Sequence, residues 1–101
     1  MPPLPTLRVL WAKPANLDLD DIAEYIGQDN PAAAIRVVLE LIERTESTLI
    51  KQPTTGRAGR LLGTRELVIG NLPYIIAYRV RENDLEILRV LHTSRRWPPD
   101  I

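Results

Sequence analysis

The residue types best suited to chemistry lie close together near the C-terminus, in the segment Leu91-His92-Thr93-Ser94-Arg95-Arg96-Trp97. His92 is the only histidine of the chain, and an imidazole can accept or donate a proton near neutral pH. The guanidiniums of Arg95 and Arg96 could bind a phosphate or a carboxylate through paired hydrogen bonds. Trp97 could anchor the tail against its own sheet or against a partner. The segment therefore indicates a catalytic or contact surface, and its residue types do not distinguish the two.

A second basic group lies upstream, where Arg57 and Arg60 occupy a glycine-containing loop and Arg65 opens the strand that follows. Three arginines on such a loop could clamp phosphates, and a solvated basic loop is the alternative. The segment is not a P-loop, because the Gly-Lys-Ser/Thr ending is missing. We expect Arg65 to be held more rigidly than Arg57 and Arg60.

Tyr78, Arg79 and Arg89 form a third group on two neighbouring predicted strands. If the hairpin between these strands is tight, alternation places Tyr78 and Arg89 on the same face. A tyrosine beside arginines can stack on a base or supply a proton, and cross-strand packing is the commoner use. Both alternatives stay open at this point.

The elements that must position these residues can be read from hydrophobic spacing. We expect a helix that begins near Asn16 or Asp18 and ends at Gly27, and a second helix from Pro31, capped by Asp29 or Asn30, to about Lys51. A loop covers residues 52–63. Alternating or apolar runs predict strands at Leu7–Trp11, Arg65–Ile69, Tyr74–Val80 and Leu85–Leu91. The predicted fold class is therefore α+β, in the order β-α-α-β-β-β, with a helical hairpin packed on one face of a mostly antiparallel four-stranded sheet.

The two central predicted strands are apolar on both faces. One face would carry Tyr74, Ile76, Tyr78, Val80, Ile87 and Leu91, and the other would carry Ile75, Ala77, Leu88 and Val90. The helices can cover only one face, and a chain this short has little left to cover the other. We therefore expect a bare, arginine-lined sheet face that a partner chain covers; the alternative is that the tail or the loop of this chain folds over it.

Composition limits the remaining possibilities. The chain has 101 residues, so we expect a single domain over 1–101, with the proline-rich residues 1–6 flexible. Cysteine is absent, and Asp18, Asp20 and Asp21 suit a helix start better than a metal cluster. We expect no metal and no cofactor. No apolar run approaches the roughly 20 residues of a membrane span, and signal-peptide features are missing, so we expect a cytoplasmic protein without membrane contact.

Charge is balanced overall but unevenly distributed. Residues 1–50 contain four Lys/Arg and eight Asp/Glu, whereas residues 51–101 contain nine Lys/Arg and five Asp/Glu. The second half is thus positively charged, and eight of its nine basic residues are arginine. This pattern indicates a surface that faces a polyanion or carboxylates, and a scattered solvated surface is the alternative. The net charge of zero disfavours a protein whose main task is broad phosphate binding.

The chain resembles the RelE/ParE superfamily of toxins from type II toxin–antitoxin modules. The resemblance spans nearly the whole chain in the same element order, including the helix opening at 17–26. The residues that carry it are Thr64-Arg65-Glu66-Leu67-Val68, Pro73-Tyr74-Ile75-Ile76-Ala77-Tyr78-Arg79-Val80 and Ile87-Leu88-Arg89-Val90-Leu91-His92-Thr93-Ser94-Arg95-Arg96.

The resemblance implies one of two toxic activities. RelE-like members cut messenger RNA on the ribosome without a metal. On that interpretation Arg65 would hold the scissile phosphate, His92 would move the proton, and Arg79 or Arg96 would stabilise the transition state. ParE-like members lack the nuclease residues and poison DNA gyrase. Ribosome-dependent members are usually lysine-rich, whereas this chain has only Lys13 and Lys51, so we favour the ParE-like branch and a protein that is not an enzyme.

Either branch implies a cognate antitoxin, and a toxin–antitoxin heterotetramer is compatible with the resemblance. A third possibility is a non-toxic interaction module of the same fold. The residues expected to contact the target or the antitoxin are Arg57, Arg60, Tyr74, Tyr78, Arg89, Arg95 and Trp97.

Overall fold

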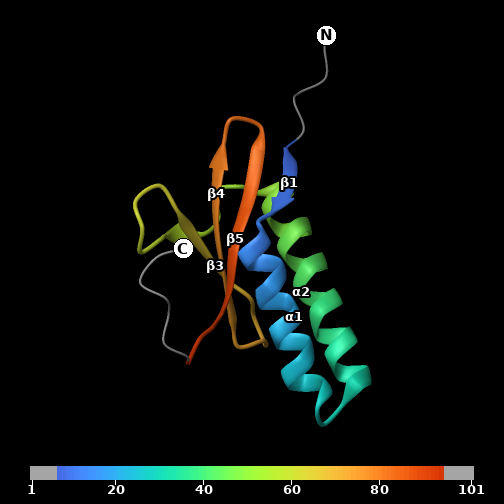
Figure 1. The fold of residues 1–101 in the computed structure, drawn as a ribbon. Coiled ribbons are helices and arrows are strands. Elements are labelled where there is room, and N and C mark those ends of the chain that lie inside the picture. The colour runs from blue at the N-terminus through green and yellow to red at the C-terminus, as the bar shows by residue number, and fades with distance from the viewer. Residues whose placement is uncertain (1–6, 95–101) are drawn as a thin grey trace.

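One strand precedes a helical hairpin and four strands follow it in the computed structural model, which describes residues 7–94 (Figure 1). The elements are β1 (Arg8–Trp11), α1 (Lys13–Gly27), α2 (Pro31–Lys51), β2 (Arg57–Ala58), β3 (Arg65–Val68), β4 (Tyr74–Arg81) and β5 (Asp84–His92). The expectation of a flexible segment at 1–6 and the roles given to Arg95, Arg96 and Trp97 fall outside the described residues.

The two helices start by different means. Asn30 caps α2, because its side chain accepts a hydrogen bond from the backbone N–H of Ala33, and this confirms the expected start at Pro31. In contrast, α1 begins at Lys13, earlier than expected, and its N-cap residue Ala12 makes no side-chain cap. Pro14 lies in the first turn of α1, where its missing N–H costs nothing, so this proline starts the helix.

The five strands form one sheet in the order β1-β5-β4-β3-β2. β1 pairs with β5 in parallel, and the other three pairings are antiparallel. This arrangement confirms the α+β class and the mostly antiparallel sheet. The sheet has one more strand than expected, because Arg57 pairs with Glu66 and Ala58 with Arg65 inside a segment predicted to be loop only.

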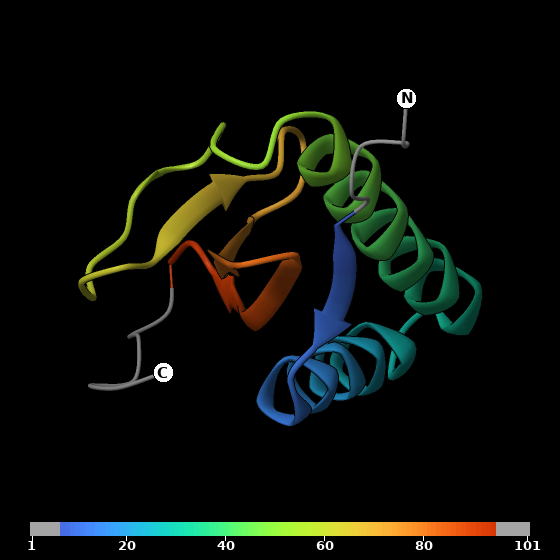
Figure 2. The same ribbon diagram turned by 90° about the horizontal axis from the view of Figure 1, so that it is seen from above.

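The helical hairpin covers one face of the sheet and builds the main core with it. Buried side chains of both helices pack against β4 and β5 in a single apolar cluster, which includes Leu19, Leu41, Leu49, Ile76, Tyr78, Leu85, Ile87 and Val90. Seen from above, α2 lies at one side of the molecule and β3 with its preceding loop at the other, with β4 and β5 between them (Figure 2). The helices leave the opposite sheet face uncovered.

A bulge changes the predicted faces of the β4–β5 hairpin. Ala77 lies opposite Arg89, but Tyr78 lies opposite Ile87, so Leu88 is an extra residue on β5. Val90 therefore joins the helix-covered core, and Leu91 belongs to the other face with Ile75. The expected shared face of Tyr78 and Arg89 is wrong, because it assumed a regular hairpin.

The expectation of a bare apolar face is also wrong. Ile75, Ala77 and Leu91 are only 6%, 0% and 6% exposed. The small Ala77 lies between the longer Glu66 and Arg89 on neighbouring strands, and such cross-strand neighbours shield one another. What this face offers to a partner is its charged side chains.

Within residues 7–94, no helix has the length and apolarity needed to cross a membrane. The same part of the chain contains no group of three or more His, Cys, Asp or Glu side chains able to hold a metal ion.

Candidate functional site

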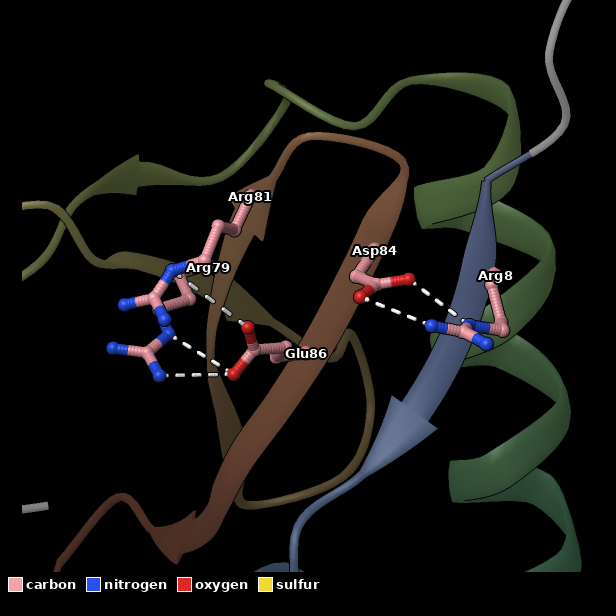
Figure 3. Close-up of polar contacts among 5 residues, drawn as sticks. All are labelled: Arg8, Arg79, Arg81, Asp84 and Glu86. Carbon is pink, nitrogen blue, oxygen red and sulfur yellow. Dashed lines mark hydrogen bonds and ion pairs between the residues drawn. The ribbon is translucent and has the colours of Figure 1, made fainter.

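Cross-strand ion pairs cover the sheet face away from the helices, toward the β4–β5 turn (Figure 3). Arg79 donates from Nε and Nη2 to the same Glu86 oxygen, at 3.1 and 2.9 Å. The Nε of Arg81 lies 3.9 Å from the other Glu86 oxygen. On β1, the Arg8 Nε donates to Asp84 at 3.0 Å. These residues share a face because their strands are paired in register.

Glu66 on β3 extends this face. It lies opposite Ala77 of β4 and opposite Arg57 of β2. Its side chain is 4% exposed and accepts from the Arg57 Nη2 at 3.2 Å and from the backbone N–H of Arg60 at 3.0 Å. The Arg60 guanidinium Nε lies 3.9 Å from the same carboxylate.

We call these eight side chains the arginine face: Arg8, Arg57, Arg60, Arg79, Arg81, Glu66, Asp84 and Glu86. Five arginines against three carboxylates leave it a net charge of +2. The Asp84 carboxylate raises the pKa of Arg8 above its ordinary value through a hydrogen bond and charge attraction. The face is thus positive, with every acid already matched to arginine.

Arg65 and Tyr78 serve the structure of the preceding loop. Arg65 donates from Nη1 to the carbonyl oxygens of Thr54 and Gly56, at 3.1 and 2.9 Å. The Tyr78 hydroxyl donates to the Pro53 carbonyl at 2.9 Å and accepts from the Gly56 N–H at 2.9 Å. Burial raises the pKa of Tyr78 above its ordinary value of 10.0, although the Gly56 N–H and the Arg65 charge oppose this. Tyr78 is fully buried, so it offers no contact surface.

Arg89 is held by a residue that the sequence analysis assigned to a helix start. The Asp18 carboxylate accepts from the Arg89 Nε and Nη2 at 2.8 and 2.9 Å, and from the Val90 N–H at 2.8 Å. β1 pairs with β5 only as far as Ile87. Beyond Ile87, the Asp18 carboxylate replaces the neighbouring strand as acceptor for the Val90 N–H. No spacing rule links Asp18 to residues more than seventy positions away, so the sequence offered no signal for this contact.

His92 lies at the end of β5, opposite Tyr74. The two rings meet edge to face with centroids 5.5 Å apart. The Ser94 N–H donates to His92 Nδ1 at 3.1 Å, so the neutral ring carries its hydrogen on Nε2. Both rings line a groove of about 460 Å³ between α1 and the β4 and β5 ends, together with Asp18, Asp21, Ile22, Tyr25, Ile26, Val37, Leu72, Pro73, Arg89, Val90 and Leu91.

The residues that a nuclease reaction would need do not come together among the described residues. Arg79 lies opposite Glu86, whereas His92 lies opposite Tyr74. Tyr74 and Arg79 are five residues apart on β4, which corresponds to roughly 16 Å. The Arg65 guanidinium faces the loop carbonyls of Thr54 and Gly56. Of the predicted contact residues, Arg57 and Arg60 join the arginine face, Tyr74 lines the groove, and Tyr78 and Arg89 have structural partners.

Comparison with known proteins gives consistent matches along the chain. The family described as "ParE toxin of type II toxin-antitoxin system, parDE" matches residues 9–97. The Y4kP protein of Sinorhizobium fredii is 44% identical over 91 residues, which cover 90% of this chain and 93% of that protein. Toxin RelE2 of Caulobacter vibrioides is 39% identical over 88 residues, which cover 87% of this chain and 97% of that protein.

A solved structure shares the fold. It comes from the chromosomal ParDE system of P. aeruginosa, with a TM-score of 0.82 and 22% identity, and the match covers 90% of this chain and 100% of that chain. At this identity the likeness is informative about the fold alone.

Proposed function

This chain belongs to the ParE family of toxins from type II toxin–antitoxin systems, and from this premise we propose that it arrests growth by binding DNA gyrase. It is the toxin component of such a module. The proposed action is binding without bond cleavage, which makes the protein an inhibitor and not an enzyme. Gyrase is a cytoplasmic target, so the proposal places the toxin in the cytoplasm.

The observation that supports this choice is the separation of the candidate nuclease groups. A metal-independent cleavage needs a phosphate ligand and a proton carrier at hydrogen-bond distance from one substrate. His92 of β5 pairs with Tyr74 of β4, which lies five residues, or roughly 16 Å, from Arg79, and Arg65 is engaged with loop carbonyls. Nothing in residues 7–94 favours the nuclease alternative over binding.

We further propose that a cognate antitoxin neutralises this toxin as part of a heterotetramer. Two surfaces support an interaction with another chain. The groove beside α1 is lined by apolar side chains such as Ile22, Ile26 and Leu72, with Asp21 and Tyr25 among its polar residues, which suits an apolar anchor of a partner. The arginine face lies on the opposite side of the sheet and suits an acidic segment.

Inducible expression of the chain alone tests the proposal. Growth arrest with filamentous cells and a DNA-damage response is the expected result. Rapid loss of translation with cleaved messages would instead support a ribosome-dependent nuclease. Absence of any arrest would leave a non-toxic interaction module. Co-expression with the product of the adjoining reading frame should restore growth, and the mass of the co-purified complex tests the heterotetramer.

A further inference from the structure

Two groups of the same composition lie side by side on the arginine face. Each consists of two arginines around one less exposed glutamate. Arg79 and Arg81, with side chains 35% and 63% exposed, share Glu86 at 21%. Arg57 and Arg60, at 58% and 59%, share Glu66 at 4%. Each group therefore carries one positive charge in excess.

The two groups are close enough for one peptide to reach both. Glu66 lies opposite Ala77, and Ala77 is two residues from Arg79 on β4. Two residues of a strand span about 7 Å, and neighbouring strands are about 4.8 Å apart. An extended segment with acidic side chains on one face has a similar spacing between successive carboxylates.

The two glutamates differ in how firmly they are held. Glu66 is buried and also accepts the backbone N–H of Arg60, so its carboxylate is part of the fold. Glu86 is more exposed; it accepts two hydrogen bonds from the Arg79 side chain and makes a longer ion pair with Arg81. A guanidinium has five donors and a carboxylate accepts about four hydrogen bonds, so two guanidiniums can serve more than one acid.

From these contacts we propose that the arginine face docks an acidic protein segment and that Glu86 is the internal counter-ion against which this segment competes. A partner carboxylate takes Arg79 and Arg81 in the geometry that Glu86 now uses. When no partner is bound, Glu86 thus pairs with Arg79 and Arg81. This pairing lowers the affinity of the arginine face for weakly acidic chains. The inference deepens the proposed neutralisation by an antitoxin, and it rests on that proposal for the identity of the partner.

The charge of the face itself favours carboxylates over a nucleic-acid backbone. Three acids are interspersed among its five arginines. A closely spaced row of phosphates would be repelled by these acids. The carboxylates of a peptide are separate groups, so each can pair with arginines away from the acids. Broad phosphate binding also normally needs a strongly basic domain, and this chain has no net charge.

Fluorescence anisotropy on the purified full chain tests the inference. The probe is a fluorescein-labelled peptide of alternating glutamate and alanine, compared with a glutamine–alanine peptide and a labelled single-stranded oligonucleotide. We expect Arg79→Gln and Arg81→Gln each to weaken binding of the acidic peptide roughly fivefold, and Glu86→Gln to strengthen it roughly threefold. The Arg81 guanidinium makes only a 3.9 Å contact, so Arg81→Gln keeps the test valid if Arg79→Gln fails to fold.

Two variants on α2 change the net charge equally and lie outside the face. Arg36→Gln matches the arginine variants and Glu43→Gln matches Glu86→Gln, because both residues are exposed. The inference is overturned if Glu86→Gln binds no more tightly than Glu43→Gln, if the glutamine peptide binds as well as the acidic one, or if the oligonucleotide binds best. Gyrase is absent from this assay, so its outcome is independent of the proposed target.

Discussion

Arg65 and Tyr78 lie directly opposite each other on β3 and β4, and both bond to the segment from Pro53 to Gly56. Tyr78 uses its hydroxyl as donor and acceptor, and Arg65 donates to two carbonyl oxygens. Two side chains of the kind that serve catalysis elsewhere therefore hold the loop that leads to Arg57 and Arg60. Their loss should change stability first and binding second.

Replacement of Tyr78 by phenylalanine should destabilise the protein. The variant leaves the Gly56 N–H and the Pro53 carbonyl without their hydroxyl partner, and a buried unsatisfied group costs about 1–3 kcal/mol. Urea unfolding measures the loss. Tyr25→Phe is the control, because Tyr25 is 63% exposed. An equal or smaller loss for Tyr78→Phe would contradict the role given to this hydroxyl.

Gly56 should not tolerate a side chain. A Cβ at this position would lie 2.6 Å from the Tyr78 Oη and 2.7 Å from its Cε1. Overpacking of this kind costs about 1–3 kcal/mol, so we expect Gly56→Ala to lower the free energy of unfolding by that amount. Gly70→Ala is a matched control, since its nearest contact would be Arg44 Nη2 at 3.5 Å. Equal stability of the two variants would show that the loop is not held against Tyr78.

Stability should fall at alkaline pH because of Tyr78. Its pKa is raised in the folded state above the ordinary value of 10.0, chiefly by burial. As pH rises above that value, the unfolded chain releases the phenolic proton while the folded chain keeps it, so the free energy of unfolding decreases. Urea unfolding at a series of alkaline pH values should show this slope in the wild type and a shallower one in Tyr78→Phe. Identical slopes would rule out this contribution.

Asp18 should matter more for folding than its neighbours on α1. Its carboxylate accepts two bonds from Arg89 and one from Val90, with side chains 12% and 21% exposed for Asp18 and Arg89. Asp18→Asn removes the charge of the carboxylate that accepts two hydrogen bonds from Arg89, and we expect a loss of about 2 kcal/mol after allowing for partial exposure. The exposed Asp20 provides the control variant Asp20→Asn. If thermal unfolding showed Asp20→Asn to be less stable than Asp18→Asn, the structural role given to Asp18 would be contradicted.

Regular features of the fold were predictable because their signals are local. Asn30 before α2, Pro31 at its first position and the apolar stripe along it set that helix, and turn residues separate β3, β4 and β5. The two-residue β2 exists only through its pairing with β3, and a pair of residues has no readable period. The extra Leu88 on β5 exchanges the faces of Val90 and Leu91, which strict alternation cannot anticipate.

The candidate site was predictable in residue type and not in partner. The sequence singles out Arg57, Arg60 and Arg79, but their pairing with Glu66 and Glu86 depends on strand register. It does not single out Arg8 or Arg81, which join the face only through the pairing of β1, β4 and β5. Asp18 was read from its neighbours on the helix, although its contacts come from β5. Side chains that act across long sequence separations are set by tertiary packing, which composition and spacing do not encode.

A supercoiling assay with purified gyrase tests the central claim most directly. We expect the wild-type toxin to inhibit gyrase in a dose-dependent manner, and His92→Gln to inhibit equally, because His92 has no chemical step to perform. Translating ribosomes incubated with the same toxin should keep their messages intact. Unaffected supercoiling together with message cleavage that His92→Gln abolishes would contradict the account.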